Sequence, residues 1–61
     1  MNALRAFRVL YGLNQEELAR IVGRSQAWVS RVERGQLLPQ EEQARKIAKV
    51  LKTDPAAFFL S

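Results

Sequence analysis

Two short helical patterns separated by a glycine turn constrain the fold of this chain more than any other feature. Asn14 and Glu17 have the spacing of a capping box, which predicts that a helix begins near Gln15. Gly23 ends that helix, because a residue without Cβ turns the chain sharply at little steric cost, and Ser25 can cap the next helix. The turn is only about three residues long, which is typical of two helices joined by a short glycine-containing turn.

The second of these helices is expected to have one buried and one exposed face. Plotted at about 100° per residue, Val29, Val32 and Glu33 fall on one side, and Gly35 ends the helix. The opposite side carries mainly polar and basic residues: Gln26, Ala27, Ser30, Arg31 and Arg34. Such a surface is usually just solvated, so it indicates a function only together with its surroundings. Trp28 lies on the flank, and we expect its ring to pack against the following helix.

Three further helices are predicted around this pair. Residues 2–11 carry one helical stripe and are followed by Gly12, and the stripe consists of Leu4, Phe7, Arg8 and Tyr11. After an irregular segment at residues 36–39, residues 40–52 again repeat small and apolar residues at helical spacing, namely Ala44, Ile47, Ala48 and Leu51. Asp54 and Pro55 have the pattern of the N-cap and first residue of a last short helix. The fold class is therefore all-α.

The length and composition predict a single domain without bound groups. The 61 residues have room for one core only, so residues 1–61 are assigned to one domain. Because cysteine and histidine are absent, neither a disulfide nor the usual zinc site is expected, and acid–base catalysis lacks its usual residues. We predict no metal, no cofactor, no small-molecule ligand and no enzymatic activity.

The charge of the chain favours a polyanionic partner without identifying it. Ten Lys and Arg residues against six Asp and Glu residues give a formal net charge of +4. The uninterrupted apolar stretches are far too short for a membrane span, and the amino terminus lacks the apolar run of a signal peptide. We expect a soluble, intracellular protein that makes no membrane contact.

The stretch LNQEELARIVGRSQAWVSRVERG, residues 13–35, resembles the helix-turn-helix of the phage repressor and Cro family. The family pattern is met at Gln15, Leu18, Ala19, Gly23, Ser25, Val29, Ser30, Glu33 and Gly35, and Pro39 matches its loop proline. The resemblance implies a compact five-helix domain of the lambda-repressor type, in which helices 2 and 3 form the helix-turn-helix at about residues 15–34. It also implies a bacterial or phage-encoded, cytoplasmic transcriptional regulator that binds double-stranded DNA, with repression as the favoured role.

The same resemblance assigns roles to individual side chains. The third helix would lie in the major groove, where the base-reading positions are Gln26, Ala27, Ser30 and Arg31. The positions expected to contact phosphate are Gln15, Ser25 and Arg34. Arg8 and Glu33 match a structural ion pair of the family. Arg20 and Arg24 are equally compatible with phosphate contact and with an ordinary surface position.

The expected partners are DNA and a second copy of the chain. One domain of this size covers a short half-site, so a palindromic operator bound by a weak homodimer is predicted. The apolar residues Phe58, Phe59 and Leu60 exceed what a single helical turn can bury, which makes them the candidate dimer surface. The alternative function is an antitoxin-like or co-regulator module, in which this apolar tail binds another protein.

Overall fold

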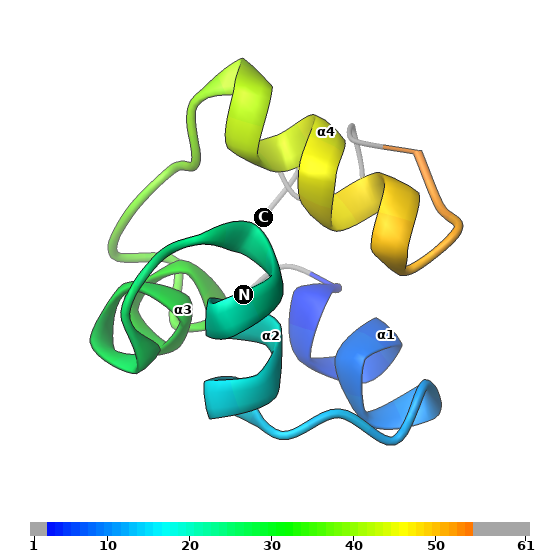
Figure 1. Ribbon diagram of the computed structural model, residues 1–61. Coiled ribbons are helices and arrows are strands. Elements are labelled where there is room, and N and C mark those ends of the chain that lie inside the picture. Colours follow the sequence, from blue (N-terminus) through cyan, green and yellow to red (C-terminus); the bar gives the residue numbers. More distant parts are fainter. Residues whose placement is uncertain (1–2, 55–61) are drawn as a thin grey trace.

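The computed structural model describes residues 3–54, and within this part helices are the only regular secondary structure, as the predicted all-α class requires (Figure 1). The helices are α1 (Leu4–Leu10), α2 (Gln15–Val22), α3 (Gln26–Glu33) and α4 (Glu41–Val50). Helix α2 packs against both α3 and α4, and α1 packs against α3. The candidate functional site lies where α1, α2 and α3 meet.

The local signals around α2 and α3 act as the sequence predicts. The Asn14 Oδ1 atom accepts the backbone N–H of Glu17 at 2.7 Å, and the Asn14 N–H donates to Glu17 Oε1 at 2.9 Å, which completes the capping box. Gly23 adopts a left-handed conformation with φ +73°, which favours glycine. Ser25 caps α3, because its hydroxyl oxygen accepts the N–H of Trp28 at 3.1 Å. The predicted starts of α2 and α3 are thereby confirmed.

The core fills the space between the four helices. It includes Leu18 from α2, Val29 from α3 and Ile47 from α4, none of which is exposed. The buried apolar residues are Leu4, Leu18, Ala19, Val22, Trp28, Val29, Val32, Ala44, Ile47, Ala48 and Leu51. Each large side chain buried in this way contributes about 1.5–3 kcal/mol. The inward face of α3, predicted from its periodicity, is therefore the face that holds this helix in place.

Helices α1 and α4 are shorter than predicted. Helix α4 ends at Val50 rather than near Lys52, because Lys52 adopts a left-handed conformation with φ +50°. The N–H of Thr53 then returns to the carbonyl oxygen of Ala48 at 2.9 Å and closes the helix end. A lysine at this position gives no signal of a turn. The helical spacing of apolar residues therefore predicted a helix that ends too late. Helix α1 ends at Leu10, one residue earlier than predicted.

Several predictions concern residues that the structure does not describe. The fifth helix was expected after Asp54, and the candidate dimer residues Phe58, Phe59 and Leu60 also lie beyond the described range. The five-helix count therefore remains a prediction. Among residues 3–54, no helix has the length and apolar character needed to cross a membrane. The same residues contain no cluster of acidic side chains suited to holding a metal ion.

Candidate nucleic-acid interface

The outward face of α3 carries the side chains that the sequence placed there. Gln26, Ala27 and Arg31 are exposed, and Ser30 is half-buried. The Arg31 side chain has no hydrogen-bond or ion-pair partner among the described residues. The only acidic residue of α3 is Glu33, which is 6% exposed and faces inward. The exposed face of this helix therefore offers donors, a methyl group and positive charge without a competing carboxylate.

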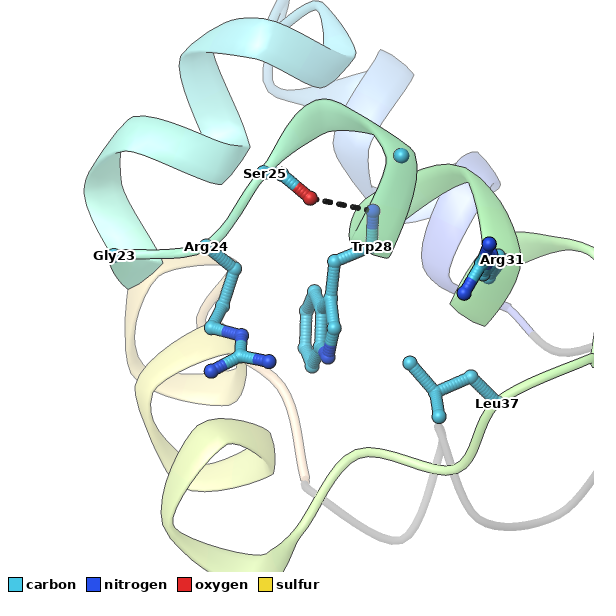
Figure 2. Close-up of a pocket in the computed structure, with 7 residues that line it drawn as sticks. Gly23, Arg24, Ser25, Trp28, Arg31 and Leu37 are labelled. Atoms are coloured by element: carbon cyan, nitrogen blue, oxygen red, sulfur yellow. Dashed lines mark hydrogen bonds between the residues drawn. The ribbon is translucent and has the colours of Figure 1, made fainter.

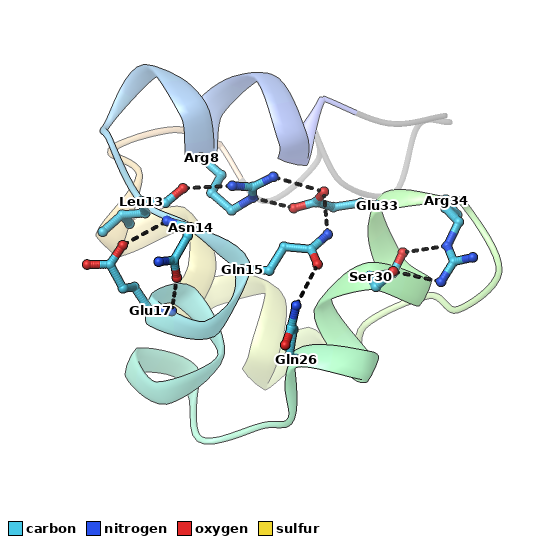
Figure 3. A network of polar contacts seen from close by, with 9 residues as sticks. All are labelled: Arg8, Leu13, Asn14, Gln15, Glu17, Gln26, Ser30, Glu33 and Arg34. Atoms are coloured by element: carbon cyan, nitrogen blue, oxygen red, sulfur yellow. Dashed lines mark hydrogen bonds and ion pairs between the residues drawn. The ribbon is translucent and has the colours of Figure 1, made fainter.

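A buried ion pair fixes α3 to α1 (Figure 3). The Arg8 Nε atom donates to Glu33 Oε2 at 2.6 Å, and Arg8 Nη2 donates to Glu33 Oε1 at 3.3 Å. The remaining guanidinium nitrogen, Nη1, donates to the carbonyl oxygen of Leu13 at 2.7 Å. Arg8 therefore joins α1, the α1–α2 loop and α3 through one planar group, which is the geometry that suits arginine.

Gln15 connects this ion pair to the outward face of α3. Its Nε2 atom donates to Glu33 Oε1 at 3.1 Å. Its Oε1 atom accepts a longer hydrogen bond of 3.4 Å from Gln26 Nε2. Figure 3 shows the Gln15 side chain lying between the two partners. The sequence predicts Gln15 at the start of α2 but gives no sign of its contact with Glu33.

Ser30 and Arg34 form a local pair on the exposed side of α3. The Arg34 Nη2 atom donates to the Ser30 hydroxyl oxygen at 2.7 Å, and Arg34 Nε donates to the Ser30 carbonyl oxygen at 3.4 Å. The four-residue spacing brings two helical side chains together, so this contact could have been predicted. It leaves the Ser30 hydroxyl free to donate its own proton to a ligand.

The turn between α2 and α3 carries an arginine stacked on the indole ring of Trp28 (Figure 2). The guanidinium carbon of Arg24 lies 5.5 Å from the ring centroid, within the range of a cation–π contact. Trp28 is only 7% exposed and belongs to the core. These two residues border an open hollow beside α3, which is lined by Gly23, Arg24, Ser25, Ala27, Trp28, Arg31 and Leu37. Arg24 is thereby placed at the edge of the candidate interface.

A second hollow reveals a basic residue that the sequence reasoning missed. It lies where α1, α2 and α3 meet and is lined by Arg5, Arg8, Gln15, Ser30, Glu33 and Arg34. Arg5 is exposed, and it stands three residues before the buried Arg8 on the same helix. That spacing places the two side chains on neighbouring positions of one helix face and was the available signal. Arg5 and Arg34 therefore bring positive charge to the hollow that Gln15 also lines.

The comparison with protein families agrees with this geometry. The family model described as "Helix-turn-helix domain" matches residues 2–58, which is nearly the whole chain. The chain belongs to this helix-turn-helix family, in agreement with its resemblance to phage repressors and Cro proteins. A search of curated proteins found no match. Membership of this family indicates DNA binding and a typically non-enzymatic role.

Proposed function

We propose that this domain binds double-stranded DNA sequence-specifically, with α3 in the major groove, and acts as a transcriptional regulator, most simply a repressor in the cytoplasm of a bacterium. The observation that carries the proposal is the outward face of α3, where Gln26, Ala27 and Arg31 are exposed while the one carboxylate of the helix is buried. The major groove admits an α-helix, and each base pair shows it a distinct set of donors, acceptors and methyl groups.

The exposed side chains suit base edges. A glutamine such as Gln26 can form two hydrogen bonds with adenine, and Arg31 can form two with guanine O6 and N7. Ala27 can contact a thymine methyl group, and the Ser30 hydroxyl can bond to several bases. Each bidentate pair discriminates against the wrong base by about 1–3 kcal/mol. Because the Arg31 side chain has no partner among residues 3–54, it can bind guanine without breaking a side-chain contact within that part of the chain.

The residues that flank α3 suit the phosphate backbone. Gln15 and Ser25 stand at the starts of α2 and α3, where the helix dipoles favour negative charge. Arg34 and Arg5 border the hollow next to Gln15 and add charge that phosphate can neutralise. Contacts of this kind fix the orientation of a protein on the duplex but do not read its sequence.

Two copies of the domain on a palindromic operator complete the proposal. Half-sites about 34 Å apart place two recognition helices on the same side of the duplex, one helical turn apart. Light scattering over a range of protein concentrations, with and without a palindromic duplex, measures the mass of the complex. Two chains per duplex are expected, and a single chain on a palindromic duplex at all concentrations would rule the dimer out.

Binding to mixed genomic duplexes over a salt series tests whether the domain binds DNA through these residues. The logarithm of the association constant should fall linearly with the logarithm of the salt concentration, by about 0.9 per phosphate contact made by an arginine. Arg5→Ala should make that slope less steep by about 0.9, the value for one phosphate contact. Arg45→Ala is the matched control, because Arg45 is also exposed but lies on α4 in an ion pair with Glu41.

A second set of variants separates base reading from backbone contact. Arg31→Ala should relax the base preference and leave non-specific binding largely intact, whereas Arg5→Ala should weaken binding to all sequences more evenly. Selection of bound sequences from a random duplex pool supplies the site for this comparison. If no salt-dependent DNA binding is found at all, the protein-interaction alternative replaces the proposed function.

A further inference from the structure

A chain of side-chain contacts runs from the core to the outward face of α3. Arg8 donates to Glu33, Glu33 accepts from Gln15, and Gln15 accepts from Gln26 (Figure 3). The first contact is buried, the second is part-buried, and the third is exposed. The chain therefore links a charge inside the domain to a side chain on its surface.

The direction of each hydrogen bond in this chain follows from the chemistry of Glu33. A carboxylate that is ion-paired with an arginine accepts hydrogen bonds and has none to donate. Gln15 must therefore turn its amide nitrogen toward Glu33, which leaves its oxygen facing the other way. Gln26 in turn must direct its amide nitrogen toward that oxygen. The oxygen of Gln26 and its second N–H then remain for a ligand.

We propose that Glu33 sets the base preference of Gln26 by fixing the orientation of both glutamine amides. This inference rests on the proposed function, since it requires that Gln26 reach a base. Adenine shows the major groove a donor at N6 beside an acceptor at N7, which matches the free oxygen and the free N–H of Gln26. Guanine shows two acceptors, O6 and N7, so only one of the two bonds can form. Adenine is therefore the preferred base.

Replacing the carboxylate by an amide removes the constraint. In Glu33→Gln, the new side chain can present either an oxygen or an NH2 group to Gln15, so both orientations of the Gln15 amide become available. Gln26 then meets either a donor or an acceptor and loses its fixed orientation. Because a bidentate contact discriminates by about five- to 150-fold, the adenine-over-guanine preference should fall by at least about fivefold.

The experiment compares dissociation constants for two duplexes that differ only in the base facing Gln26. That base pair is identified first. It is the position in the selected DNA site at which the parent chain prefers one base and Gln26→Ala does not. The readout is the ratio of the two dissociation constants, measured at a temperature well below the melting temperature of every variant. A partly unfolded variant weakens binding to both duplexes by the same factor, so the ratio does not respond to a merely structural effect.

Two further variants complete the design. Glu17→Gln is the matched control, because it makes the same chemical change at an exposed carboxylate that only caps α2, and its ratio should equal that of the parent chain. Gln15→Met breaks the chain of contacts but leaves Glu33 paired with Arg8. It should lower the ratio as Glu33→Gln does, and it carries the test if Glu33→Gln fails to fold.

The possible outcomes distinguish this proposal from the proposed function. A reduced ratio in Glu33→Gln and Gln15→Met, with Glu17→Gln unchanged, supports the role of Glu33. If Gln26→Ala changes the preference but the Glu33 and Gln15 variants do not, Glu33 has no part in base selection and only the present inference is overturned. If Gln26→Ala alters no base preference anywhere, Gln26 is not a base reader and both proposals fail for this residue.

Discussion

Glu33 has an energetic role as well as a positional one. Its side chain is 5% exposed, and both of its oxygens are occupied by Arg8, with Gln15 as a further donor. A buried ion pair need not stabilise a domain more than apolar residues of the same size would, because both charges must leave water. Removing one partner is different, since the remaining charge stays buried without compensation.

We predict that Glu33→Ala lowers the free energy of unfolding by about 3–5 kcal/mol, because it leaves Arg8 buried and unpaired. Arg31→Ala should change it by no more than about 0.5 kcal/mol, since the Arg31 side chain is exposed and has no partner among the described residues. Thermal unfolding followed by circular dichroism measures both values. Similar losses in the two variants would show that breaking the ion pair costs no more free energy of unfolding than an ordinary surface substitution.

Individual contacts differ in how well the sequence predicts them. The resemblance supplied Arg8 and Glu33 as a pair, although they are 25 residues apart. The bond between Gln15 and Glu33 was not predicted, because it depends on how closely the start of α2 approaches the end of α3. Periodicity assigns each residue to a face of its own helix but gives no distance between two helices.

Within the turn between α2 and α3, one side chain serves both the fold and the proposed interface. The Ser25 hydroxyl oxygen accepts the N–H of Trp28 and so caps α3, while its proton is available for a phosphate. Because α3 has only eight residues, its first turn depends on this cap. The two roles can be separated by a substitution that keeps the acceptor and changes the charge.

We predict that Ser25→Asp keeps the stability of the domain within about 0.5 kcal/mol, because aspartate is an equally good N-cap. The same change should weaken DNA binding, most strongly at low salt, because a carboxylate then faces the phosphates. Ser25→Ala is the control for the cap and should cost about 1 kcal/mol of stability. Undiminished DNA affinity in Ser25→Asp would place Ser25 outside the interface.

The end of α4 offers a test of backbone strain. Lys52 adopts φ +50°, a conformation that side chains with a Cβ rarely take. We predict that Lys52→Gly raises the free energy of unfolding by about 0.5–1 kcal/mol, measured by urea denaturation, because glycine adopts this conformation without strain. The exposed Lys49→Gly, inside α4, should instead destabilise the domain by about 1 kcal/mol. A destabilised Lys52→Gly would show that Lys52 is unstrained.

The helices themselves were largely predictable because their boundary residues carry local signals. Asn14, Gly23 and Ser25 determine the ends of α2 and α3 through contacts within a few residues, and such contacts can be inferred from sequence alone. The end of α4 was predicted two residues too late because Lys52 provides no such signal. The presence or absence of local capping signals therefore explains both the correctly predicted boundaries of α2 and α3 and the wrongly predicted end of α4.

The assembled domain brings together features that are separate along the chain. Arg5 on α1 and Arg34 at the end of α3 border the same hollow, which Gln15 of α2 also lines. The sequence could assign Arg34 from the family pattern, but Arg5 joins the candidate interface only because α1 packs against α3. The arrangement of basic side chains around α3 is thus a property of the packing.

Comparing the NMR spectra of the free and the DNA-bound domain tests most directly whether the outward face of α3 contacts DNA. A ¹⁵N-labelled sample is titrated with a selected duplex, and the changes in backbone and side-chain amide signals are followed by NMR. We predict the largest changes at Gln26, Ala27 and Arg31 and at the side-chain amide of Gln15, with little change along the exposed side of α4. Changes concentrated on α4, with none along α3, would contradict the account.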